Sequence, residues 1–214
     1  MKNQIVYRLI SLLFFPIMTI FIYSCSKHEE VPEIIYEMYT DSRDGQTYKY
    51  VKIGNQYWLA ENLRYRPDSG KFKAPNRDEG YVPKYGYLYD WETAHKVCPE
   101  GWHLPSDEEW KELINHLGGG IGAGGKMKEG TPGLYWSRPN TGATNESGFT
   151  ALPAGFDTGV GELSFTGKYL RLWSSTTAYS GFRGYYYSIQ WNDANVYRGD
   201  SKLSSCKSVR CIKD

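Results

Sequence analysis

Aromatic rings, rather than branched aliphatic side chains, must supply the core of this chain. Its 214 residues include 19 Tyr, 8 Phe and 7 Trp, and aromatic residues make up 16% of the sequence. Beyond the first 24 residues Leu, Ile and Val are sparse, whereas Gly, Asn and Ser are abundant. Each large ring buries much apolar surface, and Gly, Asn and Ser favour turns. The composition therefore predicts a ring-rich core surrounded by many loops.

The first 24 residues differ from the rest and are typical of a secretion signal. Lys2 and Arg8 are their only charged residues, and an apolar stretch follows at 9–22, interrupted by Pro16. A positive start, a short apolar segment and a small residue at the cleavage point define such signals. The stretch is shorter than the roughly 20 residues of a membrane-spanning helix, which argues against the alternative of a transmembrane anchor. We therefore expect residues 1–24 to be a lipoprotein signal peptide.

The end of this segment, Ile22-Tyr23-Ser24-Cys25, resembles the lipobox of bacterial lipoproteins. The resemblance implies that Cys25 becomes an acylated N-terminus, whose acyl chains suffice for stable membrane anchoring. Residues 25–36 then form a polar tether. Its acidic start resembles a surface-export signal, and an ordinary soluble linker explains it equally well. The predicted location is the cell envelope, lipid-anchored to the outer membrane with the domain exposed at the surface.

The exported part is nearly neutral and long enough for one domain. Removing Lys2 and Arg8 from the 25 Lys and Arg residues leaves 23, against 24 Asp and Glu residues. Such a balance gives no field that attracts the phosphates of nucleic acid, and we expect no nucleic-acid partner. Residues 37–214 have a comfortable length for one domain with its own core.

Three cysteines remain after Cys25, namely Cys98, Cys206 and Cys211. Exported proteins retain disulfides, so we expect one bridge and one free thiol. Cys206 and Cys211 would close a small loop, whereas Cys98 and Cys211 would connect the helical middle of the domain to its last strand. The spacing alone leaves both pairings open.

The first half of the domain is expected to contain a hairpin and two short helices. Residues 48–53 alternate in polarity, and Gly54-Asn55 forms the turn to a returning strand at 56–59. Residues 64–86, rich in Pro and Gly, are expected to be loop.

Helix signals follow in the middle of the chain. Asp90 is suited to cap a helix at 91–97, and Ser106 with Glu109 forms a capping box for a second helix. An apolar stripe from Trp110 to Leu117 follows the box, and the glycines at 118–120 end it.

Short strands and loops are expected from residue 122 onward, with a turn at 192–195. Helices followed by strands, without an internal repeat, predict an α+β domain. The candidate strands are residues 149–153, 170–175, 185–191, 196–198 and 208–212.

Six blocks, in order, resemble the Fibrobacter succinogenes major paralogous domain over about residues 37–214. The most distinctive block is CPEGWHLPSDEEW at 98–110. The others are DSRDG with VKIGNQYWLAENL at 41–63, YGYLYDW at 85–91, GFTALPAG at 148–155, WSST at 173–176 and SVRCIKD at 208–214.

This resemblance implies a surface lipoprotein of Bacteroidetes-like bacteria with a C-type-lectin-like fold, which formylglycine-generating enzyme shares. We therefore expect two short helices, short antiparallel strands and long loops, with the first and last strands paired. The resemblance also implies a Cys98–Cys211 disulfide, since both residues lie in family motifs and Cys206 does not. The family has no defined biochemical role, so function must be argued from the residues.

Catalytic signatures are missing from the sequence, which contains no HExxH, GxSxG, phosphate-loop or GxGxxG motif. Cys98 lies between His95 and His103, an order that suits a Cys–His nucleophile, but its place in the family motif favours a structural disulfide. Formylglycine-generating chemistry needs two reactive cysteines that hold copper, and the setting of Cys206 and Cys211 does not match that motif. We expect a protein that is not an enzyme and carries no cofactor.

A metal site is also not expected. Trp191-Asn192-Asp193 resembles the calcium motif of sugar-binding C-type lectins, whose oxygen ligands suit Ca²⁺. The cysteine that follows this motif closely in lectins is absent, and Arg138-Pro139-Asn140 departs from the partner motif Glu-Pro-Asn. A plain Asn-Asp turn is therefore the better interpretation.

Aromatic residues crowd the late strands. If residues alternate there, Tyr187 and Ile189 face the core and Tyr186 faces the other way. Exposed rings on that second face, or in the loop before it, would stack on sugar rings or anchor a protein partner; the alternative is aromatic core and ordinary strand surface. The candidate ligand-binding residues are Tyr179, Phe182, Arg183, Tyr186 and Arg198.

The leading hypothesis is a non-catalytic cell-envelope lipoprotein that acts as a surface binding or adhesion module for a glycan or protein ligand. The alternative is a structural subunit of a surface assembly. An enzyme related to formylglycine-generating oxidases ranks third.

Overall fold

A computed structural model describes residues 33–131, 133–159 and 165–214. The predicted signal peptide at 1–24 and the predicted acylation site Cys25 lie outside this described part. From Glu33 onward the chain forms one compact unit.

The helices and strands of this unit confirm the α+β class. In chain order they are β1 Glu37–Thr40, β2 Thr47–Ile53, β3 Gln56–Leu59, β4 Phe72–Lys73, η1 Pro75–Arg77, η2 Glu79–Tyr81, α1 Val82–Tyr85, β5 Leu88–Tyr89, α2 Trp91–Val97, β6 Trp102–His103, α3 Asp107–His116, α4 Gly120–Met127, β7 Tyr169–Ala178, η3 Tyr179–Gly181, β8 Arg183–Gln190, β9 Val196–Lys202 and β10 Ile212–Lys213.

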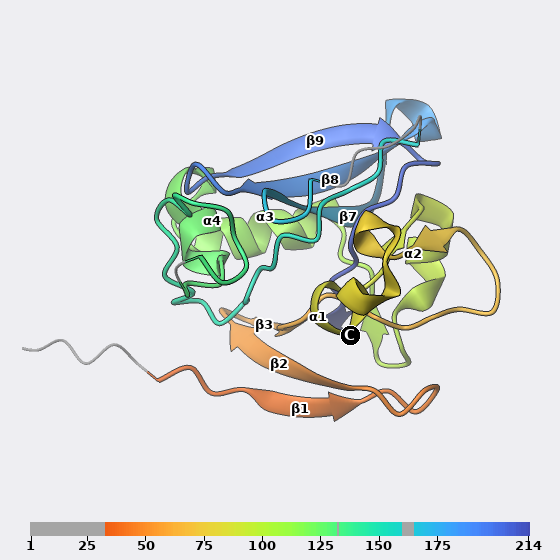
Figure 1. The fold of residues 1–214 in the computed structure, drawn as a ribbon, viewed down its shortest axis with the longest axis horizontal. Helices are drawn as coiled ribbons and strands as arrows, with labels where there is room; N and C mark the ends of the chain where they lie inside the picture. The colour runs from red at the N-terminus through yellow and green to blue at the C-terminus, as the bar shows by residue number, and fades with distance from the viewer. Residues whose placement is uncertain (1–32, 132, 160–164) are drawn as a thin grey trace, which may run out of the picture. The chain divides into compact units, whose positions relative to one another are not determined.

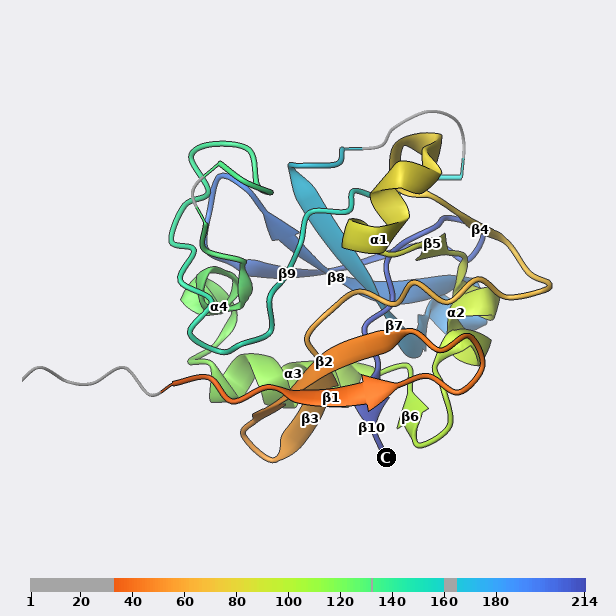
Figure 2. The same cartoon turned by 60° about the horizontal axis from the view of Figure 1, so that its bottom comes forward.

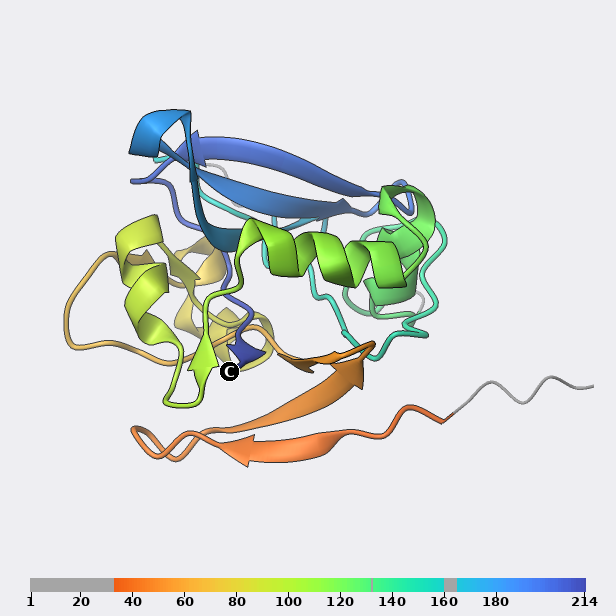
Figure 3. The ribbon, with the colours of Figure 1, turned by 180° about the vertical axis from the view of Figure 1, so that it is seen from behind.

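Two antiparallel sheets face each other across the long helix. The larger of the two has the strand order β1-β2-β3-β10-β6 and the other has the order β7-β8-β9, while β4 and β5 form a separate two-stranded sheet. The first strands lie at the bottom of Figure 1 and the β7–β9 sheet at the top. Seen from behind, α3 runs between the two sheets (Figure 3).

The last strand corrects one expectation about the larger sheet. β10 pairs with β3 and β6, whereas β1 pairs with β2, so the first and last strands share a sheet without pairing. Figure 2 shows β10 and β6 beside the β1–β3 strands, close to the C-terminus. β10 shares only Ile212 with the predicted strand at 208–212, because the backbone before it pairs elsewhere: Val209 O accepts from Leu63 N, and Ser208 bridges Leu172.

Local sequence signals correctly predicted the β2–β3 hairpin and the starts of α2 and α3. The β2–β3 hairpin turns at Gly54, whose φ of +61° favours glycine. Asp90 accepts a hydrogen bond from the Thr93 amide at the start of α2. At the start of α3, both halves of the capping box form between Ser106 and Glu109.

The described residues hold four short α-helices, two more than expected. α4 follows directly on the glycines that end α3. An added Cβ at Gly124 would lie 2.4 Å from the Asn195 carbonyl oxygen, and one at Gly125 would lie 2.3 Å from that of Gly142. Close backbone packing therefore outweighs the low helix propensity of glycine. In the predicted loop 64–86, α1 forms with Pro83 in its first turn, where proline is tolerated.

The β7–β9 sheet contains three of the predicted strands, and the predicted turn at 192–195 connects β8 to β9. The strand expected at 149–153 does not form. Thr150 has a φ of +53°, which breaks an extended run, and only Ala151 makes a bridge, with Lys128. Outside residues 132 and 160–164, the long segment between α4 and β7 therefore contains no helix or strand.

The core consists of aromatic rings, as the composition predicts. Trp110 of α3 lies 4.8 Å from Trp58 of β3 and 5.0 Å from Tyr187 of β8, measured between ring centroids. The helix therefore connects the two sheets through ring contacts, a tilted one to Trp58 and a stacked one to Tyr187. A second buried cluster contains Tyr48, Tyr89 and Trp173. Tyr187 and Ile189 are buried as expected, although Ser188 on the opposite face is buried as well, because both faces of β8 are covered.

No helix within the described residues combines the length and apolar character needed to span a bilayer.

Candidate functional site

Two of the five predicted ligand-binding residues lie exposed at one end of the β7–β9 sheet. The short η3 turn connects β7 to β8 there. Tyr179 and Phe182 are 70% and 80% exposed. Tyr179 has a φ of +50°, an unusual conformation for a bulky residue. A tight turn at the end of two paired strands thus presents two rings to solvent, and we call Tyr179 and Phe182 the hairpin-end pair.

The next two candidates are engaged by neighbouring side chains. Arg183 forms an ion pair with Asp200 of β9, and its Nη2 donates to the Asp200 carbonyl at 3.0 Å. Tyr186, three residues later, faces the opposite side of the sheet. Its ring lies 6.4 Å from that of Trp173 and 4.9 Å from the Lys207 ammonium. The structure therefore does not bring Tyr186 together with the hairpin-end pair.

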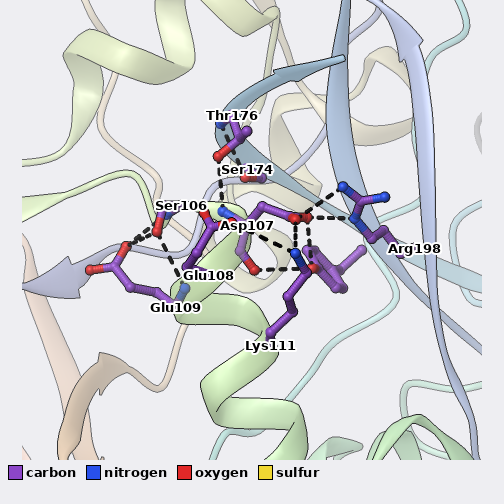
Figure 4. A network of polar contacts seen from close by, with 9 residues as sticks. Ser106, Asp107, Glu108, Glu109, Lys111, Ser174, Thr176 and Arg198 are labelled. Carbon is purple, nitrogen blue, oxygen red and sulfur yellow. Dashed lines mark hydrogen bonds and ion pairs between the residues drawn. The ribbon is translucent and has the colours of Figure 1, made fainter. Parts of the chain in front are cut away.

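The fifth candidate, Arg198, belongs to an ionic network at the start of α3 (Figure 4). Arg198 donates to both carboxylate oxygens of Asp107, from Nε at 2.6 Å and from Nη2 at 3.0 Å. Lys111 Nζ lies 2.6 Å from Asp107, and the Tyr187 hydroxyl donates to the same carboxylate at 2.9 Å. Arg198 is therefore engaged by Asp107 within the protein.

Burial and hydrogen bonding act in opposite directions on Asp107, which is 2% exposed. Burial alone would raise the pKa of this carboxyl group, but the hydrogen bonds from Arg198, Lys111 and Tyr187 outweigh it and lower the pKa to about 2. Asp107 is also the first residue of α3, where a negative charge is favoured by the helix dipole. Its backbone amide donates to Thr176 Oγ1 at 3.0 Å. The network thus connects α3 to strands β7 and β9.

His103 lies between two carboxylates. Its Nδ1 is 2.6 Å from Asp214 Oδ1, and its Nε2 is 2.8 Å from Glu109 Oε1. Burial lowers the pKa of His103, but the hydrogen bonds to Asp214 and Glu109 outweigh burial and raise it above 6.5. The His103 ring therefore bridges Asp214 and the capping box of α3.

The structure confirms the Cys98–Cys211 disulfide that the family resemblance implies. The sulfur atoms are 2.06 Å apart and connect the C-cap residue of α2 to the residue before β10. Cys206 is buried with a free thiol, and burial raises its pKa to about 11. Cys211 is therefore not available to form a reactive pair with Cys206.

The side chain of Lys128 reaches the Trp191-Asn192-Asp193 segment, whose sequence resembles the lectin calcium motif. Its buried ammonium donates to the carbonyl oxygens of Thr141, Gln190 and Asp193 at 2.8, 3.2 and 2.9 Å. An ammonium group thus holds the Asn-Asp turn against the long loop. In the described part of the chain, no three His, Cys, Asp or Glu side chains come together as metal ligands would.

A groove that the sequence did not reveal lies between the start of the domain, α1 and the long loop. Its volume is about 390 Å³. Tyr36 and Lys49 line it on the side of the first strands, Lys84 belongs to α1, and Tyr135 with Glu129 belongs to the long loop. We call it the Tyr36–Tyr135 groove. Its residues come from segments that are separated by up to 116 positions, from Tyr36 to Leu152, so no local motif marks it.

The model of one protein family, the Fibrobacter succinogenes major domain, matches residues 51–213. No curated protein and no solved structure matches the chain significantly. The match begins within β2, whereas the compact unit begins at Glu33 and includes β1.

Proposed function

The chain belongs to the Fibrobacter succinogenes major domain family, and from this premise we propose that it is a non-catalytic, lipid-anchored binding module of the cell envelope. In this proposal residues 1–24 are removed on export and Cys25 carries the lipid. The module acts at the outer membrane, exposed at the cell surface. Its ligand is a glycan or a protein.

We further propose that the domain has a C-type-lectin-like fold. Three features support this assignment: α2 and α3 pack against antiparallel sheets, a long loop follows α4, and a disulfide joins the end of α2 to the last strand. In such a fold the loops, rather than a buried cavity, supply the binding surface. The hairpin end and the long loop are surfaces of this kind.

The exposure of the hairpin-end pair is the observation that carries the binding proposal. Exposed apolar surface larger than that of a single residue often marks an interaction site, and the two rings of the pair lie three positions apart on one turn. A tyrosine and a phenylalanine 70% and 80% exposed offer flat apolar faces, and such faces stack on sugar rings or fill pockets of a protein partner. The ion pair between Arg183 and Asp200 secures the strand that follows the pair.

A binding screen of the full chain against immobilised glycans and cell-wall polymers tests this proposal. The wild-type chain is expected to bind, and the Tyr179→Ala/Phe182→Ala variant is expected to lose roughly tenfold or more in affinity, because two stacking contacts disappear. Tyr197→Ala is the matched control, since Tyr197 is an exposed ring on β9 outside the hairpin end. If the wild-type chain bound none of these glycans and polymers and a catalytic turnover were measured, the proposal would be refuted.

The anchor is tested separately, by expressing the precursor with an alkyne-labelled fatty acid. We expect label on the wild-type protein and none on Cys25→Ala, because the thiol is the attachment point. An unlabelled wild-type protein with an intact leader would refute lipid anchoring while leaving the binding test untouched.

A structural subunit of a surface assembly is the second candidate, and the outer edge of the larger sheet favours it. Ile35 and Met38 are exposed there, and β1 leaves one side of its backbone unpaired within the sheet. Edge strands of this kind accept a further strand from a partner. A molar mass that stays monomeric at millimolar concentration would count against assembly.

A further inference from the structure

We propose that the Tyr36–Tyr135 groove is a second binding site, specific for an acidic saccharide. The groove is distinct from the hairpin-end pair, and the proposal does not depend on whether that pair binds a ligand. Charge, hydrogen-bonding groups and rings in the groove each support the same ligand class.

The first argument is the charge of the groove. Lys49 and Lys84 are exposed on its walls, and neither has a carboxylate partner within the described residues. Glu61, by contrast, is already neutralised by Arg64 at 2.8 Å. Lys49 lies 5.4 Å from the ring centre of Tyr36, and Lys84 lies 3.9 Å from that of Tyr135. Neither ammonium group forms an ion pair, and the three lining cations Lys49, Arg64 and Lys84 exceed the two lining carboxylates Glu61 and Glu129 by one charge, which favours an anionic ligand.

A third cation lies beneath the groove. Arg210 is completely buried, and its Nη2 donates to the carbonyl oxygen of Thr150, a groove residue, at 3.3 Å. Its other acceptors are the carbonyls of Leu59 and Phe149 and the side chain of Asn62, all of them uncharged. Glu61, a groove residue, interacts electrostatically with this guanidinium, but no described carboxylate forms an ion pair with it, so Arg210 adds to the positive potential beside Thr150.

The second argument concerns the groups of the groove that can form hydrogen bonds with the hydroxyl groups of a saccharide. The Tyr36 hydroxyl lies 3.0 Å from Thr150 Oγ1, and Asn145 Nδ2 donates to both oxygens at 3.4 and 3.2 Å. These hydroxyl and amide groups line the groove and are able both to donate and to accept hydrogen bonds. Saccharides offer hydroxyls that donate and accept at once, whereas an acidic peptide offers mainly acceptors on its side chains.

The third argument concerns shape. A volume of about 390 Å³ falls within the range of small-ligand sites, roughly 300–1,000 Å³. The rings of Tyr36 and Tyr135, together with Ala60, Pro83 and Leu152, supply apolar surface in a lining that also contains charged and polar residues. A short segment of a uronate-bearing saccharide combines a carboxylate, several hydroxyls and an apolar ring face, and so satisfies all three features.

Calorimetric titration of the full chain with trigalacturonate tests the proposal. We expect binding that weakens as salt concentration rises, since the contacts are ionic. Lys49→Gln/Lys84→Gln is expected to reduce affinity roughly tenfold or more, because two charge-assisted contacts disappear. The neutral trisaccharide maltotriose is expected to bind much more weakly.

The matched control is Lys52→Gln/Lys213→Gln. These lysines are exposed, lie 5.5 and 5.6 Å from the ring centre of Tyr57, and are absent from the groove lining. The control removes the same net charge and is expected to bind trigalacturonate like the wild-type chain. No binding of trigalacturonate, equal binding of maltotriose, an equal loss in the control, or displacement by oligoglutamate at equal concentration would each overturn the proposal. The Tyr179→Ala/Phe182→Ala variant is expected to bind trigalacturonate like the wild-type chain. A failure of this proposal is therefore distinguishable from a failure of the proposed function.

Discussion

Replacing Cys98 and Cys211 by alanine removes the covalent connection between the end of α2 and the last strand. The bond spans 113 positions of sequence. In the chain-entropy account, cross-linking a loop of that length removes about 16 cal/mol/K from the unfolded chain, or about 4.8 kcal/mol at 25 °C. The Cys98→Ala/Cys211→Ala variant is therefore expected to lose about 4–5 kcal/mol of unfolding free energy, a large part of the stability of a domain of this size.

Urea denaturation of the full chain, followed by tryptophan fluorescence, measures this loss. The dependence of unfolding free energy on urea is expected to steepen in the variant, because an uncrosslinked unfolded chain exposes more surface. Cys206→Ala is the matched control, since Cys206 is buried but unbonded. It is expected to lose only about 1 kcal/mol, as for a small cavity, without a change in slope.

Two results would refute the reasoning. One is a double variant that unfolds within about 1 kcal/mol of the Cys206→Ala control, which would mean that the bridge does not restrict the unfolded chain. The other is peptide mapping of the exported protein that finds Cys206 bonded to Cys211.

Two further predictions concern buried charges. Lys128→Met is expected to cost about 3 kcal/mol in urea denaturation, because three buried carbonyl groups lose their donor; a loss below about 1 kcal/mol would show that water replaces the ammonium without penalty. Asp107 has a lowered pKa of about 2, so its contribution to stability is complete above pH 4 and disappears as pH falls from about 4 towards 2. The wild-type chain is therefore expected to lose about 2 kcal/mol more than Asp107→Asn over that interval, and parallel acid-denaturation curves for the two proteins would contradict the prediction.

Local chemistry explains the elements that the sequence located correctly. A capping box needs only Ser106 and Glu109, three residues apart, and the β2–β3 turn needs only Gly54 and its neighbour. Interactions of this range are complete within one turn of chain and do not depend on the rest of the fold. The Cys98–Cys211 bridge was different, since spacing left two pairings open and only the family resemblance favoured the correct one.

Tertiary packing decided the elements that the sequence missed. α4 forms from a glycine-rich segment because its backbone packs directly against the 194–195 turn. The strand expected at 149–153 is replaced by irregular chain whose carbonyls accept hydrogen bonds from Arg210. In both cases a contact with a residue more than forty positions away outweighs the local preference.

The candidate sites divide in the same way. Sequence alone identified Tyr179, Phe182 and Arg198 as candidate ligand-binding residues. Only the folded chain shows that Arg198 is bound to Asp107, 91 positions earlier, and that Lys49 and Lys84 share one groove. Residue type and spacing determine which contacts a side chain can form. Whether the side chain is available to a ligand depends on the residues that the fold brings next to it from distant segments.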